Sequence, residues 1–187
     1  MNALKKPSNL TSLSSGDVIV VGGGSAGCAA AIAAARTGAK TTLIEKNGFL
    51  GGTAVAAMVV PMMPNQSHGE NLIGGIYEEF LSGLAQKYTG AARFSDNNPG
   101  WINPEMMKAY LDEVMLKEGV QVLYNMDVIE ASTTPPLPNP PPQGGREQLP
   151  LKSKIDSITG FFKGQKIKLE AKTFIDTSGN ADLSYMA

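Results

Sequence analysis

Two short runs of aliphatic and β-branched residues enclose an alanine-rich segment near the start of the chain. The first run, residues 18–21, has the length and branching of a buried strand. Three glycines follow it, then Ser25-Ala26-Gly27, and the alanine-rich segment after these has no helix breaker before Gly38. The second run, residues 41–44, leads directly into Glu45. The pattern predicts a strand, a glycine-rich turn, a helix and a second strand, which together form a βαβ unit.

Apolar positions at helical spacing predict two more helices. One covers residues 76–88, and its buried face consists of Ile76, Phe80 and Leu84. The other begins at Pro104, behind the capping residue Asn103, and ends at Gly119. Its predicted buried stripe consists of Met107, Tyr110, Leu111, Val114 and Met115.

Strand patterns dominate the later part of the chain. The predicted strands cover residues 120–124, 128–131, 155–162, 166–171 and 173–176. The first of these is expected to be the third strand of the sheet, and the last to be buried. Two stretches rich in glycine, proline and polar residues, 65–70 and 89–102, are expected to be loops.

Proline interrupts this pattern in residues 133–150, which hold seven of the chain's 12 prolines. Because proline fixes φ and lacks an N–H donor, the segment cannot form a central strand or a helix. We expect an insert in a hairpin connection, with an SH3-type ligand as the alternative. Residues 1–16 are polar and are expected to form a mobile tail, which leaves residues 17–187 as one domain.

Composition limits the possible functions. The 187 residues are 42% hydrophobic and 18% charged, as in a soluble globular domain. A net charge of −1 offers no electrostatic basis for binding nucleic acid or an anionic membrane. Glycines 22–24 interrupt the apolar stretch, so we expect neither a signal peptide nor membrane insertion. The single cysteine fits a reducing compartment, and a cytoplasmic location is expected.

The glycine-rich turn has the spacing of a dinucleotide-binding fingerprint, Gly22-x-Gly24-x-x-Gly27. Gly22 permits the tight turn, Gly24 lets a diphosphate approach the backbone, and Gly27 allows close packing of the helix. Ser25 and Ala26 open this helix, where free N–H groups and a partial positive charge favour an anion. An ordinary βαβ turn is the alternative.

Glu45 follows Gly27 by 18 residues, so its carboxylate can accept hydrogen bonds from both ribose hydroxyls of an adenosine. Lys46 either reaches a phosphate or is solvated, and both possibilities stay open. Cys28 is expected to pack rather than to react, His68 to lie on the surface, and Trp101 to anchor its loop. No catalytic residue and no metal site can be named from the sequence.

A family resemblance is carried by residues 20–54, which read VVGGGSAGCAAAIAAARTGAKTTLIEKNGFLGGTA. This segment resembles the N-terminal part of FAD-dependent oxidoreductases of the two-dinucleotide-binding-domain type, particularly those with Leu-Gly-Gly-Thr after the acid. Residues 103–105 and 119–123 are similar to the family's path into its adenine-side strand. Residues 174–182 resemble the family motif Ile-Asp-Ala-Thr-Gly-Asp-x-Asp, although Thr177 replaces its alanine, Ser178 its threonine and Asn180 its second aspartate.

The resemblance implies an α/β fold, a Rossmann-like FAD/NAD(P)-binding domain with a central parallel sheet and an antiparallel β-hairpin crossover, truncated relative to the family. It implies FAD as the cofactor. It places Gly52 and Thr53 along the diphosphate and flavin side, and the backbone of Val128 beside the adenine. The remaining implied cofactor contacts are Ser178, Gly179 and Asp182, of which Asp182 is equally well explained as a helix N-cap.

The implied function is that of the flavin-binding, N-terminal portion of an FAD-dependent oxidoreductase, which transfers hydride from a small-molecule substrate to FAD. Two alternatives stay open: a non-catalytic truncated fragment, and an NAD-binding module of a multi-subunit enzyme. The sequence names neither the substrate nor the electron acceptor, and it does not predict the oligomeric state.

Overall fold

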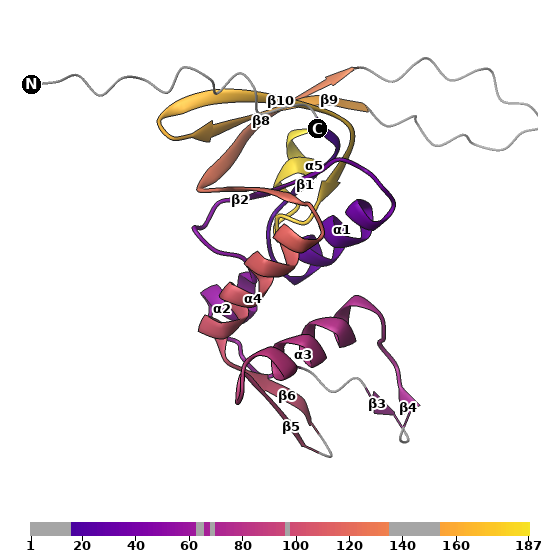
Figure 1. Ribbon diagram of the computed structural model, residues 1–187. Coiled ribbons are helices and arrows are strands. Elements are labelled where there is room, and N and C mark those ends of the chain that lie inside the picture. Colours follow the sequence, from indigo (N-terminus) through magenta and orange to yellow (C-terminus); the bar gives the residue numbers. More distant parts are fainter. Residues whose placement is uncertain (1–15, 63–65, 68–69, 96–97, 135–153) are drawn as a thin grey trace, which may run out of the picture.

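A six-stranded sheet forms the centre of the computed structural model, which describes residues 16–62, 66–67, 70–95, 98–134 and 154–187 (Figure 1). The strand order is β7-β2-β1-β10-β9-β8. In chain order these strands are β1 (Gly16–Val21), β2 (Thr41–Glu45), β7 (Gln121–Tyr124), β8 (Met126–Thr134), β9 (Lys154–Phe162) and β10 (Gln165–Asp176). Strands β7, β2, β1 and β10 are parallel, and β8 and β9 continue the sheet antiparallel. The predicted α/β class, with a parallel sheet and an antiparallel crossover, is confirmed.

The two faces of the parallel sheet bury different sets of side chains. Val20 and Leu43 face helix α1 (Ser25–Arg36) and the other helices, and both are fully buried. Their neighbours Ile19 and Ile44 face the opposite way and share a second core with strands β8–β10. Successive residues of a strand point to opposite faces, so a continuous apolar run is required where both faces are covered.

Helix α4 (Pro104–Lys117) begins as predicted. The Asn103 side chain accepts hydrogen bonds from the amides of Glu105, at 3.0 Å, and Met106, at 3.1 Å. Of the predicted stripe, Met107, Leu111 and Met115 are buried, and Tyr110 and Val114 are partly buried. Helix α3 (Ile76–Lys87) buries Phe80 and Leu84 as expected, with Ile76 partly buried.

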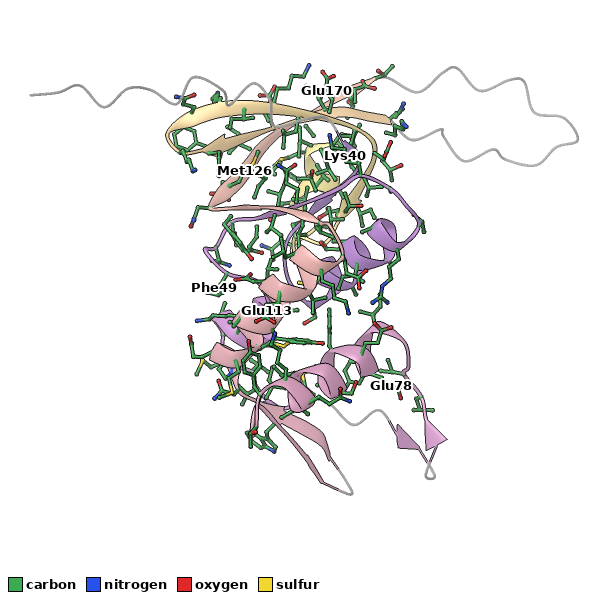
Figure 2. The ribbon with its side chains drawn as sticks, in the orientation of Figure 1. Lys40, Phe49, Glu78, Glu113, Met126 and Glu170 are labelled. Atoms are coloured by element: carbon green, nitrogen blue, oxygen red, sulfur yellow. The ribbon has the colours of Figure 1, made fainter. Side chains whose placement is uncertain are left out.

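Side chains on α3 and α4 also pair at the surface. Glu113 of α4 forms an ion pair with Lys87 and accepts a hydrogen bond from the hydroxyl of Tyr88 at 3.0 Å (Figure 2). Arg36, the last residue of α1, forms ion pairs with Glu79 and Glu118 at 2.7 and 2.8 Å. These contacts connect α1 to α3 and to the end of α4.

Two regions predicted to be loops contain short strands instead. Residues 89–102 include β5 (Ala92–Ser95) and β6 (Asn98–Ile102), an antiparallel pair. Glycine and proline suggested a loop because they are rare in strands, but a hairpin depends on pairing between strands. Trp101, which was expected to anchor its loop, is 55% exposed and pairs with Arg93 across this hairpin. Residues 65–70 contribute to β3 (Gln66–Ser67) and β4 (Glu70–Asn71), and His68 lies outside the described residues.

Strand β10 joins two segments that were predicted as separate strands. Residues 165–170 pair with β9, and the strand then continues beside β1 as far as the pairing of Val21 with Asp176. The hairpin between β9 and β10 turns at Lys163 and Gly164, which have φ values of 48° and 78°. The second half of β10 is half-buried or exposed rather than buried, because β9 no longer pairs with it.

The proline-rich segment joins antiparallel neighbours. Strand β8 extends through Thr133 and Thr134, so the first two residues of the predicted insert still pair with β9. The rest of residues 133–150 and the tail up to residue 15 lie outside the described residues, whereas Gly16 already belongs to β1. No helix within the described ranges has the length and apolar character that a membrane span requires.

Candidate functional site

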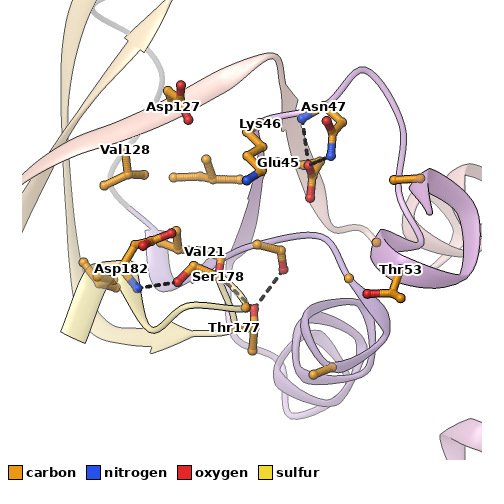
Figure 3. Close-up of a pocket in the computed structure, with 18 of the residues that line it drawn as sticks. Val21, Glu45, Lys46, Asn47, Thr53, Asp127, Val128, Thr177, Ser178 and Asp182 are labelled. Carbon is orange, nitrogen blue, oxygen red and sulfur yellow. Dashed lines mark hydrogen bonds between the residues drawn. The ribbon is translucent and has the colours of Figure 1, made fainter. Parts of the chain in front are cut away.

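A pocket of about 460 Å³ lies at the carboxyl ends of β1, β2 and β10 (Figure 3). The chain leaves β1 to form β2 on one side, whereas β10 lies on the other, so the pocket is at a topological switch point of the sheet. Its lining includes every sequence-predicted site residue except Gly27: Gly22, Gly24, Ser25, Ala26, Glu45, Lys46, Gly52, Thr53, Val128, Ser178, Gly179 and Asp182.

The glycine-rich turn forms the floor of this pocket. Gly22 has a φ of +104°, and a Cβ there would lie 2.4 Å from the carbonyl oxygen of Thr177. Gly24 is the N-cap of α1, makes no side-chain capping bond, and no acidic residue occupies the first turn. Helix α4, in contrast, is capped by Asn103. The first N–H groups of a helix have no intrahelical acceptor, so α1 offers an uncapped positive end to the pocket.

The loop after β2 reaches the glycine-rich turn directly. Gly51 donates a backbone hydrogen bond to the carbonyl of Gly23 at 2.9 Å, and Gly52 begins the short helix α2 (Gly52–Ala56), which was not predicted. A Cβ on Gly52 would lie 2.8 Å from the Cα of Gly24, whereas a Cβ on Gly24 would lie 3.9 Å from the Cα of Gly52. The two glycines thus leave a bare backbone surface.

Gly27 has a packing role. A Cβ at this position would lie 1.7 Å from the carbonyl oxygen of Gly22 and 2.7 Å from the hydroxyl of Thr177. The helix can therefore approach the turn only with glycine here, as the fingerprint predicted.

Glu45 forms one wall of the pocket with only 5% of its surface exposed. Its Oε2 accepts a hydrogen bond from the amide of Gly23 at 2.6 Å. Its Oε1 accepts from the backbone and side-chain nitrogens of Asn47 at 2.7 and 2.8 Å. The neighbouring Lys46 is exposed at the pocket lining. Asn47 itself lines the pocket and was not predicted, because an amide two residues after the acid has no recognisable spacing rule.

Asp176 organises the turn that follows β10. Its carboxylate accepts hydrogen bonds from the amide and hydroxyl groups of Ser178, at 3.0 and 2.7 Å, and of Ser184, both at 2.7 Å. Burial raises the pKa of Asp176, but these hydrogen bonds outweigh burial and hold the pKa below its ordinary value of 3.8. The turn is thereby fixed with Ser178 and Gly179 at the pocket.

Asp182 is the first residue of helix α5 (Asp182–Met186), and Ala181, with a φ of 58°, is the N-cap. The alternative interpretation of Asp182 as the helix N-cap is therefore wrong. Its amide instead donates to the hydroxyl of Ser178 at 2.7 Å. Residues 126–128 of β8 line the opposite side of the pocket, and Thr177 contributes at the end of β10.

Cys28 packs in the core and is fully buried. Burial raises the pKa of its thiol to about 12, and the Sγ atom donates a weak hydrogen bond to the carbonyl of Gly23 at 3.4 Å. A thiol that stays protonated is unreactive, so the predicted packing role is confirmed.

Comparison with known families identifies the class of this protein. Residues 17–187 match the sequence profile of the family described as FAD dependent oxidoreductase. The chain belongs to the FAD-dependent oxidoreductase family. FAD is the cofactor of this family, as the sequence predicted. A comparison with curated proteins finds no match.

Solved structures with the same fold are much longer than this chain, which covers 41–57% of the three described below. A flavoprotein/dehydrogenase from Cytophaga hutchinsonii has a TM-score of 0.56 and 20% identity, with 92% of this chain and 41% of that one covered. THI4 from Thermovibrio ammonificans has a TM-score of 0.55 and 13% identity, with 87% and 57% covered. The 3-ketosteroid-Δ4-(5α)-dehydrogenase from Rhodococcus jostii RHA1 has a TM-score of 0.52 and 16% identity, with 89% and 47% covered. At these identities the likeness establishes the fold alone.

Proposed function

We propose that this chain binds the adenosine diphosphate part of FAD in an oxidoreductase that transfers hydride from a small-molecule substrate to FAD. The supporting observation is the bare backbone surface made by Gly24 and Gly52 at the uncapped start of α1. A side chain on Gly24 would extend over this surface, whereas a Cβ on Gly52 would clash with the Cα of Gly24 at 2.8 Å. An anionic diphosphate matches the charge and shape of this surface. The pocket therefore fits the cofactor of the family.

Each part of the pocket has a proposed partner on the cofactor. The amides of Gly24, Ser25 and Ala26 would hold the diphosphate, and Glu45 the adenosine ribose. The backbone of Val128 would lie beside the adenine. Gly52, Thr53, Ser178, Gly179 and Asp182 would lie along the diphosphate toward the flavin, with Lys46 near a phosphate.

The chain's contribution to the reaction is to bind, orient and shield the cofactor. Ile44, Met126 and Leu183 are buried apolar residues that line the pocket and keep water from the nucleotide. Bound FAD supplies the chemistry, which is acceptance of a hydride from the substrate.

The direct test is the cofactor content of the purified full chain. We expect a yellow protein that releases FAD on denaturation, and a colourless, nucleotide-free Gly24→Val variant, because the branched side chain fills the diphosphate surface. A colourless wild-type protein that retains an adenine dinucleotide would instead favour an NAD-binding module. A folded wild-type protein that binds no dinucleotide would overturn the proposal and favour a non-catalytic fragment.

We also propose a cytoplasmic location, because the only cysteine of the chain is a buried free thiol. Fractionation of cells that express the full-length protein tests this location.

A further inference from the structure

The carboxylate of Glu45 is already bonded by three N–H donors of the chain itself. Gly23 donates to Oε2, and both nitrogens of Asn47 donate to Oε1. Figure 3 shows Asn47 directed at Glu45 along both of these bonds. The same carboxylate borders the pocket that we propose for the adenosine ribose.

The number of acceptor positions on a carboxylate limits what else Glu45 can bind. An ionised carboxylate offers about four acceptor positions, two on each oxygen. Asn47 fills both positions on Oε1, and the Gly23 amide fills one position on Oε2. One position on Oε2 is left for a ligand.

Asn47 is itself held by the turn between β7 and β8. Its backbone carbonyl oxygen accepts a hydrogen bond from the backbone amide of Asn125 at 3.1 Å. Asn125, with a φ of 55°, forms the turn between β7 and β8 and leads directly into residues 126–128, which line the pocket. Asn47 thus connects the acid of β2 to the turn that leads into β8.

We propose that Asn47 is a positioning residue that orients Glu45 so that the carboxylate accepts a hydrogen bond from a single ribose hydroxyl. This inference rests on the proposed function, and it narrows the sequence-based prediction of two ribose contacts to one. Its consequence is unequal recognition: one ribose hydroxyl of the adenosine contributes strongly to binding and the other contributes little.

Calorimetric titration of the full chain with ADP, 2′-deoxy-ADP and 3′-deoxy-ADP tests this consequence. We expect one deoxy analogue to bind about tenfold more weakly than ADP, and the other within about twofold of ADP. In Asn47→Ala the side-chain donor is gone and one position on Oε1 is free, so the carboxylate can accept from either hydroxyl. The ratio between the two analogues is then expected to fall toward one.

A matched control is Asn125→Gly. Glycine suits the positive φ at this position and keeps the backbone N–H that donates to the backbone carbonyl of Asn47. This variant should keep the wild-type ratio. The inference is overturned if wild type binds both deoxy analogues equally more weakly than ADP, or if the ratio of their affinities is unchanged in Asn47→Ala. In either case, binding of ADP itself would still support the proposed function. Absence of ADP binding to folded wild-type protein overturns both. The ratio is independent of a general loss of affinity, which a purely structural role of Asn47 would produce.

Discussion

The hydroxyl of Thr177 donates a hydrogen bond to the carbonyl oxygen of Gly22 at 2.8 Å, across 155 positions of sequence. The same hydroxyl lies 2.9 Å from the carbonyl oxygen of Val21, which also accepts from the Thr177 amide at 2.9 Å. The end of β10 is therefore bonded to the turn that forms the pocket floor. Alanine occupies this position in the family motif that the chain resembles, so the hydroxyl contact belongs to this chain's own sequence.

Replacing Thr177 by valine should weaken both the fold and the site. Valine keeps the shape but not the donor, so the carbonyl of Gly22 loses this hydrogen bond, at a cost of about 1–2 kcal/mol. Denaturant titration measures the loss, and calorimetry should show weaker ADP binding because the turn is less well fixed. Thr177→Ser retains the hydroxyl and should recover most of both. Equal behaviour of the two variants would contradict this role.

Replacing two glycines of the fingerprint by alanine should lower the free energy of unfolding by very different amounts. In Gly27→Ala the new Cβ would lie 1.7 Å from a backbone oxygen, and we expect a loss of about 3 kcal/mol or more in the free energy of unfolding. In Gly24→Ala the nearest atom lies 3.9 Å away and φ is −70°, so the loss should stay below about 1 kcal/mol.

The Gly24→Ala variant, although stable, should bind ADP less tightly than wild type. The Gly24→Ala side chain extends over the surface proposed for the diphosphate, so ADP affinity should fall by about tenfold or more while the protein stays folded. A Gly24→Ala protein with wild-type ADP affinity would show that no diphosphate approaches this backbone.

The Asp176 carboxylate should make the free energy of unfolding depend on pH. Its folded-state pKa lies below the ordinary 3.8, so its contribution is present above this value and is lost as the pH falls through the lower folded-state pKa. Asp176→Asn cannot accept all four bonds and should be less stable at neutral pH. The difference in unfolding free energy between wild type and this variant should shrink in acid. A difference that stays constant with pH would exclude the carboxylate as its origin.

The Cys28 thiol should resist modification in the folded protein. With its pKa raised to about 12 and its surface buried, reaction with Ellman's reagent at mildly alkaline pH should be very slow. The same reagent should titrate one thiol once the chain is unfolded in urea, since this is the only cysteine. Rapid labelling of the folded chain would mean that the start of α1 opens readily.

Arg36 should contribute to helix packing through charge alone. Its guanidinium bonds both oxygens of Glu79, at 3.0 and 2.7 Å, and Glu118 at 2.8 Å, all at the surface. Arg36→Met should lower the melting temperature slightly at low salt and have no effect at high salt, because exposed ion pairs are screened. ADP binding should be unchanged, since Arg36 is not part of the pocket lining.

Local chemistry explains which elements could be predicted. The start of α4 depends on Asn103 and Pro104 alone, and the alternation of buried and exposed residues in β10 follows from the pleat of a single strand. The hairpin of β5 and β6 was missed because its composition is that of a loop, and pairing between two segments leaves no pattern in either one.

The sequence by itself determined the turn, the helix start and the acid: positive φ at Gly22, a missing Cβ at Gly24 and Gly27, and a carboxylate at the end of the next strand. The family resemblance had placed Gly52 and Ser178 at the cofactor, and the tertiary structure brings them to the same pocket. Only the tertiary structure decided that Asn47 and Gly23 occupy most of the Glu45 carboxylate. The physical reason is the distance along the sequence over which each kind of interaction acts. Backbone conformation follows from neighbouring residues, whereas these contacts form only when the packed sheet brings distant segments together.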